Sequence, residues 1–158
     1  MKVEDVMTKD VRSCSPDTDL AAAAMLMWEH DCGTLPVVGD GGRIVGMITD
    51  RDICIAAATK HQDIAGVKVS EVTTGQVYSC TPGQDVSEAL ETFRQAQVRR
   101  LPVVDDEGKL QGILSMNDIV LHAGEGRGKG ATDIPYAEVV NTFKAICAPH
   151  SKRAAAGA

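Results

Sequence analysis

The sequence predicts an α/β fold of the α+β kind: two tandem β-α-β-β-α repeats packed about a pseudo-twofold axis, followed by a C-terminal helix. The first observation is an internal repeat. When the chain is shifted by 66 residues, residues 2–53 align with residues 68–119 without a gap, with 19 identities in 52 positions. The second observation is that apolar and turn-forming segments follow the same order in both copies. Two copies are too few for a solenoid, so we expect the halves to pack against each other.

Length and composition are those of an ordinary globular protein. The 158 residues are 44% apolar and 24% charged, with a formal net charge of −6, and a chain of this size can bury a core without disulfides or metals. The basic residues are dispersed, which argues against a nucleic-acid partner. The longest apolar run, Leu20–Trp28, is about half of a membrane span, and the acidic N-terminus does not read as a signal peptide. We therefore expect a cytoplasmic protein without a membrane partner.

The first repeat is assigned to residues 2–60. Pro16 is expected to end its first strand, Asp19 to cap its first helix, and Gly33 to end that helix. Residues 39–42 have the glycine-rich chemistry of a hairpin turn. The expected strand, helix, two strands and helix are Val11–Cys14, Leu20–Glu29, Leu35–Val38, Ile44–Ile48 and Asp50–Ala58.

The second repeat is assigned to residues 67–122 and is expected to have the same elements. Asp85 is the predicted N-cap of its first helix. The expected segments are Val77–Cys80, Val86–Gln95, Leu101–Val104, Leu110–Leu114 and Asn117–His122.

The remaining chain predicts a linker, a helix and a frayed end. Residues 123–134 form a glycine-rich linker. Residues 135–148 predict a helix with Pro135 in its first position, and residues 149–158 predict a flexible tail. The apolar face expected on the helix consists of Tyr136, Val139, Val140, Phe143, Ile146 and Cys147.

Each repeat ends its last strand in a hydroxyl residue that an aspartate follows three positions later: Thr49 and Asp52, then Ser115 and Asp118. One interpretation is a capping box, in which each side chain satisfies a backbone N–H of the other residue. Another is a ligand site, because the start of a helix attracts phosphate. The hydroxyl can donate to a phosphate oxygen, and the carboxylate can accept hydrogen bonds from a ribose diol. The two interpretations are compatible.

Arg99 and Arg100 precede a strand in the second repeat only, since the first repeat has Gly33 and Thr34 at the same positions. A solvated basic pair at the end of a helix is one interpretation. The other is a phosphate clamp, because guanidinium groups bind phosphate in a bidentate manner. If the protein binds a nucleotide, its two halves should therefore bind unequally.

The repeats resemble a pair of CBS domains, the tandem arrangement also called a Bateman module. The resemblance covers residues 2–122. It rests on paired blocks that recur in order: Val6-Met7 and Val72-Thr73, Leu-Pro-Val-Val at 35–38 and 101–104, and Gly-x-[Ile/Leu]-[Thr/Ser]-x-x-Asp-Ile from Gly46 and Gly112. Within that family the chain resembles the small stand-alone bacterial proteins of the hypoxic response type.

The resemblance implies two candidate sites in a cleft between two sheets, and ligands such as AMP, ADP, ATP, NAD or S-adenosylmethionine. Thr49 and Asp52 would face the phosphate and ribose in one site, and Ser115 and Asp118 in the other. The first strand of each repeat would hold adenine, and Arg100 matches the basic residue that the family often has near phosphate. The other residues implied at the sites are Val11, Cys14, Pro36, Val77, Cys80, Arg99, Arg100 and Pro102.

These features predict a regulatory binding protein rather than an enzyme, with an adenosine nucleotide as regulatory ligand and no required cofactor. We expect a homodimer that acts on an unidentified protein target. The rival prediction is a structural or redox- or metal-responsive interaction protein, in which the paired motifs are only helix caps. The cysteines are odd in number and form no CxxC pair, which fits reduced thiols. A zinc site from His122, Cys147 and His150 is a further alternative.

Overall fold

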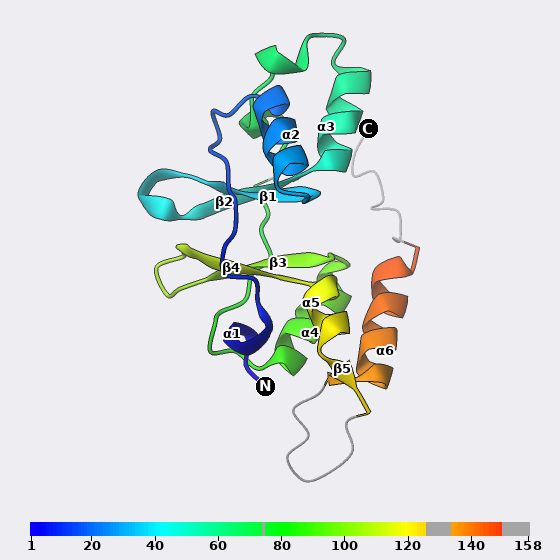
Figure 1. The fold of residues 1–158 in the computed structure, drawn as a ribbon. Helices are drawn as coiled ribbons and strands as arrows, with labels where there is room; N and C mark the ends of the chain where they lie inside the picture. Colours follow the sequence, from blue (N-terminus) through cyan, green and yellow to red (C-terminus); the bar gives the residue numbers. More distant parts are fainter. Residues whose placement is uncertain (74, 126–133, 150–158) are drawn as a thin grey trace, which may run out of the picture.

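Two antiparallel hairpins lie across the middle of the molecule, and helices cover their outer faces (Figure 1). This computed structural model describes residues 1–73, 75–125 and 134–149. Strand β1 (Thr34–Val38) pairs with β2 (Ile44–Thr49), and β3 (Arg100–Val104) pairs with β4 (Leu110–Ser115). The register shifts at the same repeat position in both hairpins, just before the last residue of β1 and of β3. The predicted fold class is confirmed.

The helices follow the repeat. In the first repeat, α2 (Leu20–Glu29) and α3 (Asp50–Thr59) pack together outside β1 and β2, and α4 (Val86–Ala96) and α5 (Met116–Leu121) take the corresponding places in the second (Figure 1). Helix α6 (Tyr136–Cys147) packs against α4. The short elements are α1 (Val3–Val6), three 3₁₀ turns (Asp40–Gly42, Ile64–Gly66 and Val69–Glu71), and the paired β5 (Ala123–Gly124) and β6 (Ile134–Pro135). No helix in the described ranges is long and apolar enough to span a membrane.

The start of each repeat is buried in the core of the other repeat. Val3 and Val6 belong to the core of the second repeat, whereas Val67 and Val69 belong to the core of the first. The backbone N–H of Leu20 donates to the Val67 carbonyl oxygen at 2.9 Å, which fixes one of these crossings. The crossings interlock the two repeats and set the hairpins side by side.

The strands expected at Val11–Cys14 and Val77–Cys80 are each reduced to one bridging residue. Cys14 bridges Val37, and Cys80 bridges the corresponding residue of β3, both in parallel orientation. Residues 11–13 and 76–79 make none of the backbone hydrogen bonds found among the described residues. The prediction of full strands was wrong because the chain leaves the sheet at these points and runs between the two repeats.

The predicted cap at Asp19 is confirmed, whereas the predictions for Asp85 and Gly33 need correction. The Asp19 side chain accepts a hydrogen bond from the Ala22 N–H at 2.8 Å, as predicted for a cap. Asp85 also stands at an N-cap, but its carboxylate makes no capping bond and pairs with Lys2 Nζ at 3.0 Å. Gly33 does not end α2. The chain turns two residues earlier, where Asp31 adopts a left-handed conformation with φ of 48°.

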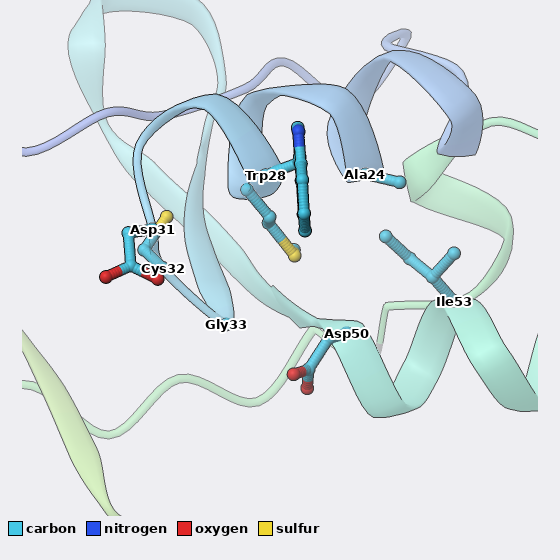
Figure 2. A pocket seen from close by; sticks show the side chains of 8 residues that line it. Ala24, Trp28, Asp31, Cys32, Gly33, Asp50 and Ile53 are labelled. Atoms are coloured by element: carbon cyan, nitrogen blue, oxygen red, sulfur yellow. The ribbon is translucent and has the colours of Figure 1, made fainter.

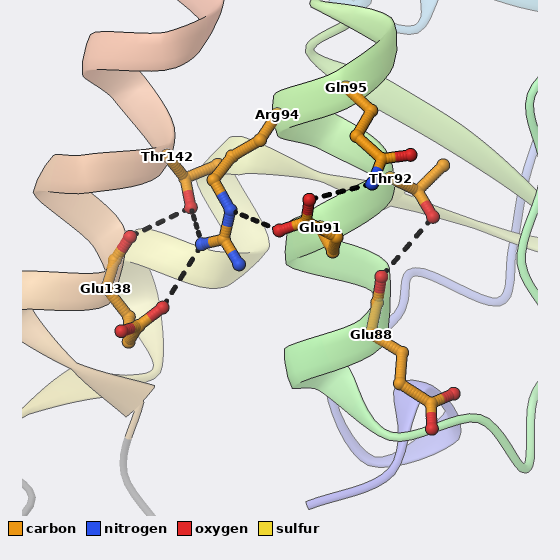
Figure 3. Close-up of polar contacts among 7 residues, drawn as sticks. All are labelled: Glu88, Glu91, Thr92, Arg94, Gln95, Glu138 and Thr142. Atoms are coloured by element: carbon orange, nitrogen blue, oxygen red, sulfur yellow. Dashed lines mark hydrogen bonds and ion pairs between the residues drawn. The ribbon is translucent and has the colours of Figure 1, made fainter.

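Helix α6 is present, but rotated from the expected apolar face. Its buried residues are Val139, Thr142 and Ile146, whereas Tyr136 and Val140 are more than half exposed. Polar contacts with α4 set this rotation (Figure 3). Pro135 is the N-cap residue rather than the first helical residue, because it pairs in β6. The predicted linker therefore begins and ends in paired β5 and β6; its middle, residues 126–133, and the tail from 150 lie outside the described residues.

Candidate ligand pockets between the repeats

Two hollows of similar size lie between the repeats and correspond to each other under the 66-residue shift. The Asp52 pocket, about 490 Å³, is lined by residues 49–52 at the β2–α3 junction and by 76–78 and 97–100 from the second repeat. The Asp118 pocket, about 470 Å³, is lined by Ser115, Asn117 and Asp118 with residues 10–12 and 30–34. Volumes of this order suit small-molecule ligands.

Thr49 and Asp52 form a complete capping box at the start of α3. Asp52 Oδ2 accepts hydrogen bonds from the Thr49 N–H at 2.9 Å and from Thr49 Oγ1 at 2.7 Å, and the Asp52 N–H donates to Thr49 Oγ1 at 3.2 Å. All of these carboxylate bonds use Oδ2. Among the described residues Oδ1 has no hydrogen-bond donor, so this oxygen can accept from a ligand while its neighbour caps the helix.

Ser115 and Asp118 repeat this geometry at the start of α5. Asp118 Oδ2 accepts from the Ser115 N–H at 2.8 Å and from Ser115 Oγ at 2.6 Å. Here the second carboxylate oxygen, Oδ1, also accepts a hydrogen bond from Thr8 Oγ1 at 3.2 Å. Thr74, the repeat equivalent of Thr8, lies outside the described residues. The capping interpretation is thus confirmed at both places.

Extended backbone faces each pocket at the places where strands were expected. Val77 and Tyr78 line the Asp52 pocket, and Val11 and Arg12 line the Asp118 pocket. Their N–H and C=O groups are not used in the backbone hydrogen bonds of the described chain. Exposed backbone groups beside a half-buried valine offer a planar heterocycle both edge hydrogen bonds and an apolar contact.

The two pockets differ most in charge. The charged residues of the Asp52 pocket are three arginines and two aspartates, Arg51, Arg99, Arg100, Asp50 and Asp52. The Asp118 pocket has two arginines and three aspartates, Arg12, Arg100, Asp10, Asp31 and Asp118. None of the four arginines forms an ion pair among the described residues. Arg100 lines both pockets, and Arg99 lines only the more positive one.

The structure brings together eight of the twelve residues predicted at the sites. Thr49, Asp52, Val77, Arg99 and Arg100 line one pocket, and Val11, Ser115 and Asp118 join Arg100 in the other.

The other four are buried and line neither pocket: Pro36 and Pro102 lie in the middle of β1 and β3, and Cys14 and Cys80 form the bridges to these strands. Burial raises the pKa of the Cys14 thiol to about 11 and that of Cys80 to about 12. Both thiols are therefore protonated at neutral pH and poor nucleophiles.

Residues missed by the sequence prediction close one side of the Asp52 pocket. They are Gln97, which follows α4, and Ile146 of α6. The repeat gave no signal for Gln97, because its equivalent in the other pocket, Asp31, was not predicted at a site either. No repeat equivalent exists for Ile146, since α6 has no counterpart in the first repeat.

A third hollow, of about 400 Å³, lies outside the interface between the repeats. It is lined by Ala24, Met27, Trp28, Asp31, Cys32, Gly33, Asp50 and Ile53, and the Trp28 ring stands among these side chains (Figure 2). Trp28 is 84% exposed and Met25, on the same helix, is 56% exposed. An indole so exposed is typical of a contact surface.

The zinc alternative gains no support in the part of the chain that the structure describes. No group of three or more potential metal ligands occurs there. The His122 ring nitrogen Nδ1 lies 2.8 Å from the Asp118 carbonyl oxygen, and His150 is outside the described residues.

The chain matches the CBS domain family over residues 3–58 and 69–125. It is 34% identical over 139 residues to the CBS domain-containing protein YhcV of Bacillus subtilis, covering 87% of this chain and 97% of that protein. It is also 34% identical over 145 residues to hypoxic response protein 1 of Mycobacterium tuberculosis, covering 92% and 93% of the two chains. Both matched relatives are stand-alone proteins of this kind.

Two solved structures are similar. A structure of hypoxic response protein I with two coordinated zinc ions matches with a TM-score of 0.71 and 34% identity, covering 78% of this chain and all of that one. A structure of CBSX2 in complex with AMP matches with a TM-score of 0.67 and 28% identity, covering 76% of this chain and 93% of that one. Similar chains are thus seen with different ligands.

Proposed function

The chain belongs to the CBS domain family, and on that basis we propose that it is a regulatory module that binds an adenosine nucleotide in the Asp52 pocket. The proposal treats the protein as a binding protein rather than an enzyme. It also assigns the two pockets different roles, since only the Asp52 pocket carries an excess of guanidinium groups.

The proposed binding mode follows from the groups that line this pocket. Adenine lies against Val77 and takes edge hydrogen bonds from the free backbone of residues 76–78. The ribose diol donates to Asp52 Oδ1, the oxygen that capping leaves available. The phosphate meets Arg99 and Arg100, with Arg51 in the first turn of α3 on the same wall.

The excess of positive charge carries the proposal. A phosphate brings one to several negative charges into a pocket, and the Asp52 pocket compensates them with arginines that have no other ion partner among the described residues. The Asp118 pocket, with its majority of aspartates, disfavours the same ligand. The known complex of CBSX2 with AMP supports this choice of ligand class.

Thermal unfolding with AMP, ADP, ATP, NAD, S-adenosylmethionine and adenosine tests the proposal. A ligand at 100 times its Kd adds about 2.7 kcal/mol to the free energy of unfolding, which for this chain length raises Tm by roughly 5–10 °C. Arg99→Ala should weaken AMP binding by about tenfold or more while sparing adenosine. Arg12→Ala, an arginine of the other pocket, is the control. If no adenosine compound shifts Tm at millimolar concentration, the nucleotide function is wrong.

The rival prediction of a redox-responsive protein is not favoured by the two cysteines that the repeats share, because both are buried with raised thiol pKa values. Self-association remains part of the proposal. We propose that a second copy covers the exposed face of α2 around Trp28 (Figure 2), because burial of this apolar surface would favour association. The downstream protein target and the cytoplasmic location stay predictions from the sequence.

A further inference from the structure

The last turn of α6 forms part of the wall of the Asp52 pocket. Ile146 lines the pocket, and so does Gln97, whose side chain also binds α6. Gln97 Nε2 donates to the carbonyl oxygens of Ala145 at 2.9 Å and of Ala148 at 3.2 Å. The last carbonyl groups of a helix lack the usual N–H four residues on, and the Ala145 oxygen also accepts from the Ala148 N–H at 3.3 Å. Gln97 thus ties this end of α6 to the pocket.

Helix α6 is held on α4 by one apolar face and a small polar network (Figure 3). Arg94 Nη1 donates to Glu138 Oε2 and to Thr142 Oγ1, both at 3.1 Å, while its Nε donates to Glu91 at 2.9 Å. Val139 of the same helix is buried in the core of the second repeat. The bonds from Arg94 to α6 and the burial of Val139 are all lost if α6 moves away from α4.

Within the described ranges, no helix packs on α2 at the corresponding place in the first repeat. Under the repeat shift, Arg94 and Gln97 correspond to Trp28 and Asp31, which line the open hollow over α2 (Figure 2). No residue of α6 lines the Asp118 pocket. Helix α6 therefore distinguishes the two pockets structurally, in addition to their difference in charge.

We propose that docking of α6 on α4 and occupancy of the Asp52 pocket are thermodynamically linked. The proposal rests on the nucleotide function argued above and adds its regulation. A nucleotide in the pocket gains the contacts with Ile146 and with the tethered Gln97 only when α6 is docked. It therefore holds α6 against α4, and an empty pocket lets α6 open more often. By linkage, the docked helix raises nucleotide affinity by the same factor.

Hydrogen–deuterium exchange on the full chain, with and without AMP, tests the linkage directly. AMP should slow the exchange of residues 136–147, and also that of residues 49–52, which mark occupancy of the pocket. Arg94→Ala should speed the exchange of α6 without AMP, and AMP should largely restore protection. Gln95→Ala is the matched control, because Gln95 lies on α4 and its side chain binds Glu91 rather than α6.

A pair of neighbouring variants tests the reciprocal effect. Val139→Asp places a carboxylate on the buried face of α6 and should undock the helix without altering a pocket residue. Val140→Asp introduces the same side chain at a position that is 52% exposed. We expect Val139→Asp to weaken AMP binding at least about fivefold, the lower end of usual coupling between sites, and Val140→Asp to bind like the unmodified protein.

The outcomes separate this inference from the proposed function. If AMP protects residues 49–52 but not α6, the linkage is refuted and the nucleotide function stands. The same conclusion follows if Val139→Asp, with its circular dichroism showing a folded protein, keeps full AMP affinity. If AMP protects neither segment, both proposals fail. Should Val139→Asp not fold, the exchange comparison of Arg94→Ala with Gln95→Ala decides the question.

Discussion

Asp52→Ala and Asp118→Ala form a matched pair that separates ligand binding from helix capping. Both aspartates accept the same two bonds through Oδ2, from the backbone N–H and the hydroxyl of the residue three positions earlier, at 2.6–2.9 Å. Each substitution removes one half of a capping box. Only Asp52, however, lies in the pocket with excess guanidinium charge.

The contacts of the two aspartates give the expected losses of stability and of AMP affinity. Loss of a cap costs about 0.5–2 kcal/mol of unfolding free energy, and each kcal/mol lowers Tm by roughly 2–4 °C at this chain length. Asp118→Ala also loses the bond from Thr8, and both variants should lose stability of this order. For AMP affinity, Asp52→Ala should have the larger effect of the two substitutions. Asp52→Ala removes charge-assisted bonds to the ribose, worth about 1.5–3 kcal/mol or roughly 10–150-fold, while Asp118→Ala changes it less than about twofold.

Differential scanning calorimetry gives the loss of stability, and titration calorimetry with AMP, well below both Tm values, gives the affinities. Comparable losses of stability with unequal losses of affinity would support the assignment. The reasoning is refuted if both variants bind AMP like the unmodified protein, since Asp52 would then be a cap and nothing more. It is equally refuted if Asp118→Ala is the variant that abolishes binding.

Three further outcomes are expected. Gly112→Ala should destabilise the protein by about 1–3 kcal/mol in calorimetry, because the new Cβ would lie 2.8 Å from a backbone carbonyl oxygen, whereas the equivalent Gly46→Ala, with 3.5 Å to its nearest neighbour, should be tolerated. Maleimide should label exposed Cys54 in the folded protein but Cys80 only on unfolding. Burial raises the pKa of Cys80 from 9.0 to about 12. The contribution of the protonated Cys80 thiol to the free energy of unfolding should therefore be lost as pH rises from about 9 to 12 in alkaline titrations. Fluorescence of the sole tryptophan, Trp28, should shift to shorter wavelength as concentration rises, if a second copy covers it; a spectrum independent of concentration in a proven dimer would place the interface elsewhere.

The sequence predicted the elements that depend on interactions between residues close together in the chain. The bounds of α2 follow from its cap at Asp19 and its run of strong helix formers. The hairpin turns follow from glycine, since Gly41, Gly42 and Gly108 all have positive φ values. The hydroxyl–aspartate pairs form their capping boxes as expected because the partners are only three residues apart.

Features that depend on distant segments were not predictable in the same way. Burial of Val3 in the second repeat requires a partner core most of which lies more than eighty residues away in the sequence. The rotation of α6 depends on Arg94, whose contacts with Glu138 and Thr142 bury Thr142 in place of a more apolar neighbour. Asp85 was expected to cap α4, but the opposite charge on Lys2 draws its carboxylate away and lowers its pKa.

Comparison of the two repeats distinguishes positions that the fold requires from positions that set the ligand. Leu35 and Leu101 are identical and fully buried. The residues just before them, at 33–34 and 99–100, differ and line the pockets.

Packing also bears on the difference at position 33. A Cβ atom on Gly33 would lie 2.9 Å from Asp50 Oδ2, so the first repeat cannot carry an arginine there unless Asp50 moves. In the second repeat the position of Asp50 is taken by Met116, which is buried. Arg99 and Asp50 both line the Asp52 pocket, so these two exchanges offset each other in charge. The net excess of positive charge there comes from the other differences between the repeats: Arg51 stands in place of Asn117, and Gln76 and Gln97 in place of Asp10 and Asp31, which outweighs Tyr78 in place of Arg12.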